Sequence, residues 1–432
     1  MSEGMGYGAY AIDWNYLINE ADIVPAPVNI FCNGMDQMAD GRLMIVGGDQ
    51  AGHVGLSFAG IFDPGNESWT VLPNMAYPRW YPTLTSLPDG RLIVTSGEMN
   101  GPETDQPVPE IFNPSTTSWS LLSSAPLPFI PVNYYYPHTL LLPDGRLLVP
   151  ASTEDSIVSQ VLDLGSLTWT SVGGLAVDGG SSAMYLPGKI LKTGTSNDTD
   201  NDAAGNTRSS ANTAFVLDMT QPSPAWTQVA PMQYGRTYHC TTVLPDGNVL
   251  VTGGGSTTYP TTDFSTPLLQ PELWSPVTQT WTTLSPMATP RLYHGVALLL
   301  PDARVLVSGG GRWPSNNQPT DQLSAEFFSP PYLFKGPRPA ISSAPSQLVY
   351  GQNFTVQTPD ATRIAKVSLI RFGAVTHSFN TGEYFIPLNF TVGTSSLTVT
   401  APSSSNAAPP GNYMLFLVDT NGVPSLAAIA HF

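Results

Sequence analysis

Short apolar runs alternate with polar turns along most of the chain. One set of runs, rich in Leu, Ile and Val, ends in small residues: RLMIVGG, RLIVTSG, RLLVPAS, KILKTGT, NVLVTGGG and RVLVSGGG. A second set joins two stretches through a polar turn and contains a Trp: FDPGNESWTVL, FNPSTTSWSLL, LDLGSLTWTSV, LDMTQPSPAWTQV and WSPVTQTWTTL. Runs this short, bounded by Gly, Pro, Asn and Asp, are typical of strands. Because the two sets alternate, each pair predicts four short strands.

This four-strand unit repeats along the first three quarters of the chain. Four short strands in a repeat of roughly fifty residues indicate a blade of a kelch-type β-propeller. Six copies of the first half are legible, including a degenerate one at Leu186-Pro187-Gly188. The segment 10–23 resembles only the trailing half of a further blade. We therefore predict a seven-bladed propeller with six blades clear from the sequence, the seventh being completed by unrecognised strands or cut short.

A second fold is expected after the repeats end at Phe327. The proline-rich segment SPPYLFKGPRPAISSAP follows, and beyond it come the short strands FTVQT, VSLIRF, SLTVTA and YMLFLVD. Strands of this kind over roughly ninety residues favour a small immunoglobulin-like β-sandwich. The expected organisation is all-β, with a propeller over residues 1–331 and a sandwich over residues 332–432.

Composition agrees with two globular domains and excludes several function classes. The 432 residues exceed one ordinary core, and 41% of them are hydrophobic. Only 11% are charged, with a net charge of −16. Such a surface repels phosphate backbones, so we expect no nucleic-acid partner. We also expect no membrane span, because no apolar run is long enough for one. Two cysteines allow at most one disulfide. We expect a monomer.

The sequence leaves the cellular location open. The N-terminus MSEGMGYGAYAIDW lacks the basic and then apolar pattern of a signal peptide. Low Lys, abundant Ser, Thr and Pro, and four N-x-(S/T) sequons (Asn66, Asn197, Asn353, Asn389) favour an extracellular or cell-envelope protein whose signal peptide is not in this sequence. A cytoplasmic location stays open, since a chain rich in Ser and Thr contains sequons by chance.

A recurring turn gives the candidate chemistry a fixed register. The turn is an x-Asp-Gly or x-Asp-Ala step centred on Asp40, Asp89, Asp144, Asp246 and Asp302. Seven residues before the first residue of each turn stand a thiol, three phenols and an imidazole: Cys32, Tyr81, Tyr136, Tyr238 and His294. The same offset in a repeat protein means the same place in each unit. We call these five the register residues, and we expect them to converge on one axis.

The register residues should lie at one mouth of the propeller, together with certain loops. A hairpin brings the start of its first strand and the end of its second strand to the same edge. The loops that follow the small-residue endings therefore face the same mouth and are expected to meet a substrate: 98–104, 153–156, 196–210, 256–265 and 312–319.

From the residues alone, several candidates keep a purely structural alternative. Adjacent strand residues point to opposite faces, so Tyr293 and His294 can bind one metal only at an irregular strand end. Cys32 could be a small apolar filler beside Tyr81. His239 and His377 could be a structural and a surface-loop histidine. The sequence contains no phosphate-binding loop, dinucleotide fingerprint, zinc-ligand spacing or nucleophile elbow.

Six longer motifs point to a family. FCNG, PRWYPTLTSLPDGRLIV, YYPHTLLLPDG, RLYHGVALLLPD, SLIRFGAVTHSFNT and GNYMLFLVDTNGVPS occur in this order between Phe31 and Phe432. With them the chain resembles the copper-radical oxidases, the galactose oxidase and glyoxal oxidase family, over nearly its whole length. The segments RWY and YP before two of the turns are closer to the glyoxal oxidase branch.

The resemblance implies a metal site and an activity. It implies one copper ion held by Tyr81, Tyr293, His294 and His377, and a thioether between Cys32 and Tyr81 that stores a radical on Tyr81. Tyr293 would be the axial ligand and take the substrate's proton. Imidazole and phenolate suit Cu(II). The implied reaction oxidises small primary alcohols, or aldehydes as hydrates, and reduces O2 to hydrogen peroxide. The alternative is a kelch-type binding module with a vestigial metal site.

The chain also departs from galactose oxidase. Met99 stands where galactose oxidase has a stacking Trp, and we expect Trp313, in the last mouth loop, to cover the copper instead. We expect Met99, Tyr136, Tyr238 and Trp313 to contact substrate. The sequence shows no carbohydrate-binding domain and no disulfide framework of the galactose oxidase type. The first departure, Met99 in place of the stacking Trp, argues against galactose as the substrate.

Overall fold

The structure of the protein is a computed structural model, which describes residues 9–101, 104–128, 135–153, 156–195, 209–257, 266–311 and 321–432. Strands make up nearly all of its regular structure. The helical turns in the described ranges are two short 3-10 segments, η1 (Pro331–Phe334) and η2 (Ala361–Arg363). None of the helices in this part of the chain is long and apolar enough to cross a membrane. The predicted all-β class is confirmed.

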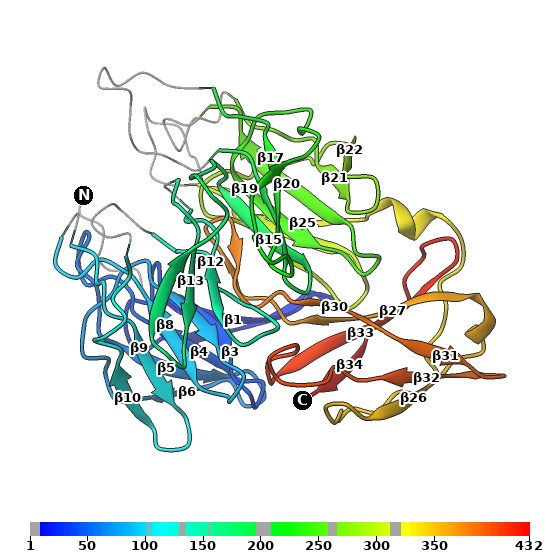
Figure 1. Cartoon of the computed structure of the whole chain (residues 1–432), viewed down its shortest axis with the longest axis horizontal. Coiled ribbons are helices and arrows are strands. Elements are labelled where there is room, and N and C mark those ends of the chain that lie inside the picture. Colours follow the sequence, from blue (N-terminus) through cyan, green and yellow to red (C-terminus); the bar gives the residue numbers. More distant parts are fainter. Residues whose placement is uncertain are drawn as a thin grey trace.

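Five four-stranded antiparallel sheets form successive blades (Figure 1). The first contains β3 (Gly34–Gln37), β4 (Leu43–Val46), β5 (Ala59–Asp63) and β6 (Ser68–Val71). The second contains β7 (Thr83–Ser86), β8 (Leu92–Thr95), β9 (Glu110–Asn113) and β10 (Ser118–Leu121). The third contains β11 (Leu140–Leu141), β12 (Leu147–Val149), β13 (Gln160–Asp163) and β14 (Thr168–Ser171). The fourth contains β15 (Ser181–Leu186), β16 (Lys189–Thr193), β17 (Ala214–Asp218) and β18 (Thr227–Gln228). The fifth contains β19 (Thr237–Val243), β20 (Val249–Gly255), β21 (Glu272–Ser275) and β22 (Thr280–Thr283).

The ring ends with a shorter sheet and an N-terminal hairpin. A three-stranded sheet contains β23 (Gly295–Leu299), β24 (Val305–Gly309) and β25 (Ala325–Phe328), and β1 (Tyr10–Asn15) pairs only with β2 (Glu20–Pro25). Ala11 and Val24 of this hairpin pack against the apolar cluster of the first sheet. On the other side Trp14 lies 5.8 Å, between ring centroids, from Phe327 of β25. The hairpin thus packs between the first and last sheets, as the trailing half of a seventh blade.

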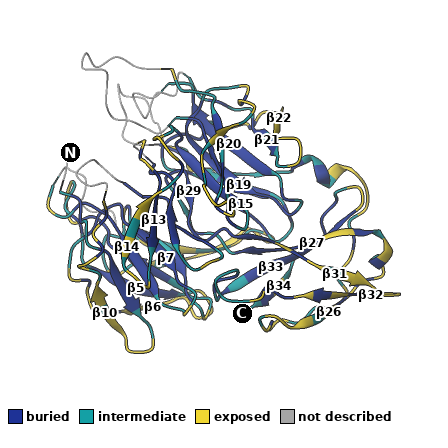
Figure 2. Cartoon of the chain, viewed as in Figure 1, coloured by how far each residue is buried: buried dark blue, intermediate teal, exposed yellow. Residues whose placement is uncertain are grey.

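The recurring Trp joins neighbouring blades in several repeats. In three of them its indole nitrogen donates a hydrogen bond to a carbonyl after the preceding sheet: Trp119 to Pro73 at 2.9 Å, Trp169 to Ala125 at 3.1 Å and Trp281 to Ala230 at 2.8 Å. Trp226 donates instead to Ser159 Oγ at 2.9 Å. Inner strands are buried and the outermost strands are exposed (Figure 2). The sequence repeat therefore encodes both the blade and its contact with the previous one, and the predicted kelch-type propeller is confirmed.

Residues after η1 form two further sheets with a shared core. One contains β26 (Asn353–Gln357), β32 (Ser396–Thr400) and β31 (Phe390–Val392), and the other contains β30 (Phe385–Leu388), β27 (Ile364–Arg371), β33 (Asn412–Asp419) and β34 (Ala428–His431). Side chains from both sheets, such as Val356 and Leu415, meet in one buried cluster. These strands, gold to red in Figure 1, lie beside the propeller. They form the predicted β-sandwich. The predicted boundary between residues 331 and 332 falls within η1.

A buried ion pair anchors the sandwich to the propeller. Nη1 of Arg371, on β27, donates to Oδ1 of Asp36, on β3, at 2.8 Å. Its Nη2 donates to the Gln37 carbonyl at 2.7 Å and to Ser86 Oγ at 3.0 Å. Arg371 and Asp36 are both fully buried. A small hairpin, β28 (Val375–Thr376) and β29 (Phe379–Asn380), follows directly from β27. The anchor therefore sits just before the segment that enters the propeller.

Candidate metal centre

The five register residues share one uncommon backbone conformation. Their φ angles are positive: 55° at Cys32, 61° at Tyr81, 47° at Tyr136, 54° at Tyr238 and 64° at His294. Residues with a side chain rarely adopt this left-handed region, which costs about 1–3 kcal/mol at each position. The conformation recurs because each register residue stands at the same entry to an inner strand. It interrupts the alternation of side chains, so a register residue and its predecessor can lie on the same side.

Two pairs of sequence neighbours use this irregular strand entry. The rings of Tyr293 and His294 lie 3.9 Å apart between centroids, and those of Trp80 and Tyr81 lie 4.2 Å apart. A regular strand would point the members of each pair to opposite faces. The sequence condition for Tyr293 and His294 to share one site, an irregular strand end, is therefore met.

His377 reaches the same mouth from the β28–β29 hairpin. His377 and Ser378 form its two-residue turn, with φ angles of 43° and 69°, as a type I′ turn requires. Propeller hydroxyls hold the turn: Thr153 Oγ1 donates to the His377 carbonyl at 2.8 Å, and Ser181 Oγ donates to the Ser378 carbonyl at 2.6 Å. His377 is 5% exposed. It is thus a buried residue of the propeller mouth and not a surface-loop histidine.

Five candidate side chains converge at this point. The candidate ligand atoms of Cys32, His294 and His377 lie within 4.8 Å of one another. The hydroxyl groups of Tyr81 and Tyr293 are hydrogen-bonded to each other. The Tyr81 and Tyr293 rings lie 4.9 and 5.3 Å, respectively, from the His377 ring, edge to face. Cys32, Tyr81, Tyr293, His294 and His377 therefore surround one small volume.

The outer nitrogens of the two histidines are already engaged. His294 Nδ1 lies 2.9 Å from the Gly311 carbonyl, which can only accept, so Nδ1 carries the hydrogen and Nε2 presents its lone pair. His377 Nδ1 lies 2.6 Å from Thr376 Oγ1, and its Nε2 lies 3.9 Å from Cys32 Sγ. A hydrogen bond that fixes the outer nitrogen is typical of metal-binding histidines. Two imidazole nitrogens with two phenol oxygens fit a Cu(II) ion.

Tyr136 and Tyr238 support the rings of this cluster. Tyr136 stacks on His377 with centroids 4.6 Å apart, and its hydroxyl donates to the Asn33 carbonyl at 2.9 Å. Burial raises the pKa of Tyr136 well above its ordinary value. Tyr238 meets Tyr293 edge to face at 5.0 Å. Both are buried, at 2% and 4% exposure. Their contact with substrate stays a prediction.

The remaining sequence candidates lie outside this cluster or outside the described residues. Met99 is half-buried, and its sulfur accepts a hydrogen bond from Gln106 Nε2 at 3.2 Å. His239 is fully buried against Thr193 Oγ1 at 2.8 Å, and burial lowers its pKa to about 3, which fits the structural interpretation. The two cysteines, Cys32 and Cys240, do not form a disulfide. Trp313 lies outside the described residues.

Sequence reasoning missed a group of residues beside Tyr81. Trp80 and Tyr135 pack on its ring, and Glu98 and His53 lie behind them. Trp80 and Tyr135 each immediately precede a register residue. The sequence signal for them is the aromatic pairs WY and YY, but alternation along a regular strand points the first member of each pair to the opposite face.

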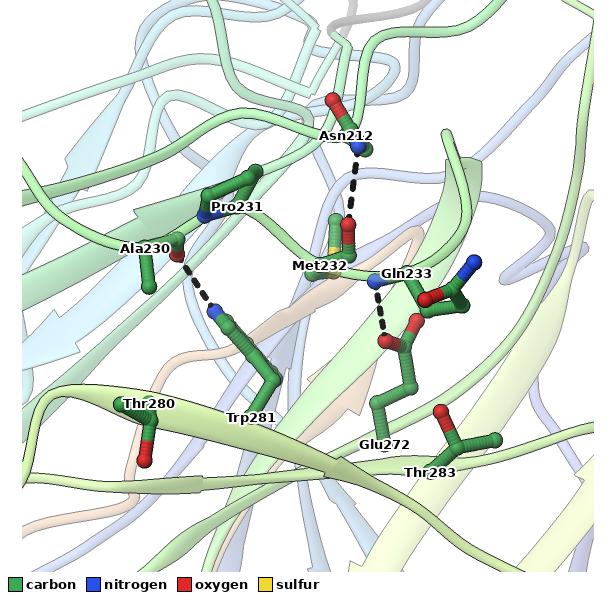
Figure 3. A pocket seen from close by; sticks show the side chains of 9 residues that line it. All are labelled: Asn212, Ala230, Pro231, Met232, Gln233, Glu272, Thr280, Trp281 and Thr283. Carbon is green, nitrogen blue, oxygen red and sulfur yellow. Dashed lines mark hydrogen bonds between the residues drawn. The ribbon is translucent and has the colours of Figure 1, made fainter.

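A separate cavity of about 430 Å³ lies between blades, away from this cluster (Figure 3). Its lining includes Gln233, Glu272 and Trp281. Gln233 donates its backbone N–H to Glu272, and Trp281 donates to the Ala230 carbonyl, as the dashed lines show. Glu272 also pairs with Arg236 at 2.9 Å. These groups join two blades, so the cavity is part of the blade interface.

Known proteins resemble both parts of the chain. Residues 7–332 match the family described as glyoxal oxidase N-terminus, and residues 338–431 match the galactose oxidase-like early set domain. The chain is 30% identical to a galactose oxidase of Gibberella zeae, over 95% of this chain and 62% of that protein. It is 29% identical to the aldehyde oxidase GLOX of Vitis pseudoreticulata, over 92% of this chain and 80% of that protein. A solved fungal alcohol oxidase of the AA5 family in complex with copper is 27% identical, with a TM-score of 0.85 over 98% of this chain and 90% of that one. The chain matches 62% of the length of the Gibberella enzyme, which is less than two thirds.

Proposed function

Because the chain belongs to the glyoxal oxidase family and contains a galactose oxidase-like early set domain, we propose that it is a copper-radical oxidase. It oxidises small primary alcohols, or aldehydes as their hydrates, and reduces O2 to hydrogen peroxide. The relatives named galactose oxidase, aldehyde oxidase and copper-containing alcohol oxidase support this proposal. The observation that carries it is the convergence of Cys32, Tyr81, Tyr293, His294 and His377 on one volume.

Four of these side chains would hold the copper ion: Tyr81, Tyr293, His294 and His377. Their inward-facing imidazole nitrogens and paired phenol oxygens form the appropriate donor set. Bound copper supplies a one-electron couple, and a tyrosine that can also lose one electron completes the capacity for a two-electron oxidation. Removing two electrons and two protons converts a primary alcohol into an aldehyde, and O2 accepts both pairs as hydrogen peroxide.

We propose Cys32 and Tyr81 as the redox-active pair. The Tyr81 backbone N–H donates to the Cys32 carbonyl at 3.0 Å, and both side chains belong to one buried cluster with Trp80, Tyr135 and Tyr136. A thioether would form by loss of the thiol hydrogen and one ring hydrogen, with O2 accepting the two electrons and two protons. Sulfur substitution makes the phenol easier to oxidise, so Tyr81 is the side chain on which we place the radical.

We propose Tyr293 as the base for the substrate. Its phenol oxygen is hydrogen-bonded to that of Tyr81, so a substrate hydroxyl beside Tyr293 would also lie near the Tyr81 ring. Tyr293 would accept the proton of the substrate hydroxyl. Tyr81 would remove a hydrogen atom from the carbon that bears this hydroxyl. Tyr238, edge-on to Tyr293 at 5.0 Å, would hold this ring in place.

A peroxide-coupled assay of the copper-loaded protein tests the proposed function. We expect hydrogen peroxide from at least one small primary alcohol or aldehyde, and none after His377→Ala. No peroxide from a broad panel, with copper bound and no radical signal, would favour the kelch-type binding module with a vestigial site. The monomeric state and the extracellular or cell-envelope location stay predictions.

A further inference from the structure

Glu98 links several residues beside Tyr81 that the proposed chemistry does not use. It follows β8 and is fully buried, at 0% exposure. The Tyr135 hydroxyl donates to its Oε1 at 2.6 Å, and His53 Nδ1 lies 2.8 Å from its Oε2. The backbone N–H and carbonyl of Glu98 both pair with those of Trp80 at 2.8 Å. Glu98 therefore fixes the side chains of Tyr135 and His53 and the backbone of Trp80.

These partners of Glu98 cover the Tyr81 ring. Between centroids, Trp80 lies 4.2 Å and Tyr135 lies 4.5 Å from Tyr81. His53 packs edge to face against Trp80 at 4.5 Å. If Glu98 Oε1 moved, Tyr135 would lose its hydrogen bond, and its ring could leave Tyr81. If Oε2 moved, His53 would lose its contact, and Trp80, which packs against both His53 and Tyr81, would lose its support.

Other buried glutamates of the propeller have a different setting. Glu110 pairs with Arg79 and Glu272 pairs with Arg236, each at 2.9 Å. Those ion pairs lie within the blades and fix loops that join them. The donors that Glu98 meets among the described residues are instead a phenol and an imidazole next to the metal centre. Its contacts thus point to the chemistry of Tyr81 more than to the packing of blades.

We propose that Glu98 is a positioning residue for the Tyr81 radical, an inference that rests on the proposed function. Its carboxylate holds Tyr135 and Trp80 against the phenol ring, where they exclude water. Its negative charge favours the oxidised form of Tyr81, because a charge in a buried, weakly polarisable region acts strongly on a neighbour. In the titration at an electrode, Tyr81, whose phenol would be ionised on binding copper, gives one electron to the electrode and releases no proton.

Glu98→Gln in the copper-loaded protein tests this inference. Glutamine has nearly the same shape, but its amide nitrogen cannot accept the hydrogen bond that one of the two donors offers. We expect the equilibrium to shift against the radical by about tenfold, which is about 59 mV upward for a one-electron couple. Spectroelectrochemical titration at an electrode, with the radical followed by absorbance and electron paramagnetic resonance, measures this shift. Copper affinity should not change.

Two further variants separate charge and geometry from general effects. Asp89→Asn, in the exposed turn at the other end of the β7–β8 hairpin, removes the same charge and should leave the potential unchanged. Tyr135→Phe keeps the ring and removes one hydrogen bond to Glu98, so it should raise the potential less than Glu98→Gln does. It also provides the test if Glu98→Gln does not fold.

Two outcomes would contradict this inference, and they can be told apart. An unchanged potential and radical lifetime in both Glu98→Gln and Tyr135→Phe, with copper bound, would overturn the role of Glu98 alone. Absence of a radical in the loaded parent protein, under any applied potential, would overturn the proposed function and this inference together.

Discussion

The sulfur of Cys32 lies 3.9 Å from Nε2 of His377, although 345 positions separate the two residues. Cys32 begins the first blade, and His377 forms the tip of a hairpin from the sandwich. Their contact closes the candidate centre from two parts of the chain. It also makes the centre sensitive to changes both in the inner strands and in the packing of the sandwich.

Cys32→Ser should abolish the predicted thioether. In the parent protein, incubation with copper and O2 should lower the intact mass by two hydrogens, because the bond replaces one S–H and one ring C–H. Intact-mass spectrometry before and after loading measures this change. Cys240→Ser is the matched control, since Cys240 is also buried but lies outside the cluster. An unchanged mass in the loaded parent protein would exclude the cross-link.

His294→Ala and His377→Ala should each weaken copper binding strongly. Loss of a residue that merely supports a ligand lowers metal affinity by about 10–100-fold, so loss of a ligand should lower it by at least about 100-fold. Competition with a chelator of known affinity measures the effect. His431→Ala should have no effect, because His431, in β34, is not part of the cluster and its Nδ1 pairs with Asn412 Oδ1 at 2.9 Å. Equal affinity in all three variants would contradict the ligand assignment.

Arg371→Met should destabilise the whole protein. It would leave the Asp36 carboxylate buried without its cation, which costs about 3–5 kcal/mol of unfolding free energy. Urea denaturation followed by tryptophan fluorescence measures the loss. Adding Asp36→Asn should restore part of it, whereas Arg42→Met, which breaks an exposed pair with Asp40, should cost less than about 1 kcal/mol. A loss as small as that of Arg42→Met would refute the anchoring role.

Glu383 should make stability fall as pH rises. Burial raises the pKa of Glu383 from 4.5 to about 8, while its carboxyl accepts hydrogen bonds from the Val243 N–H and Asn380 Nδ2. Between these values the unfolded chain has already released the proton that the folded protein keeps. The unfolding free energy therefore decreases as the pH rises through this window. A difference of one pKa unit corresponds to about 1.4 kcal/mol, so the total loss is a few kcal/mol.

Glu383→Gln gives the matched comparison, because glutamine does not ionise. The unfolding free energies of the parent and the variant, measured in urea from pH 4 to pH 9, should diverge in favour of the variant as the pH rises. Parallel curves over this whole range would show that Glu383 is not protonated in the folded protein.

The strands and the mouth were predictable because their signals are local. Turns such as Asp89-Gly90 and Asp144-Gly145 lie between short apolar runs, and both elements are encoded within a few residues. The register then placed Cys32, Tyr81 and His294 at one end of the propeller. Fixed repeat geometry converts an offset in sequence into a position in space.

The rest of the centre depends on features that the local pattern does not encode. Tyr293 and Trp80 lie on the side of their register neighbours only because those neighbours have positive φ. His377 arrives through the tertiary docking of a hairpin, so only the resemblance to a family placed it there. Glu98, at the start of the predicted mouth loop 98–104, meets His53 from the segment between β4 and β5, and no periodicity relates them.

The left-handed strand entry has a further consequence for how a propeller can hold a reactive centre. A regular strand offers the axis every second side chain, so each blade would supply a single group at its rim. A register residue with positive φ lets the blade supply two consecutive groups, as Trp80 and Tyr81 and as Tyr293 and His294 do. Gly180, the corresponding residue of the degenerate repeat, is not among the residues with positive φ, and its blade offers no such pair. Some blades therefore supply two side chains to the mouth and others supply fewer. The repeated scaffold becomes asymmetric at its mouth, with the reactive side chains gathered on one side of the axis.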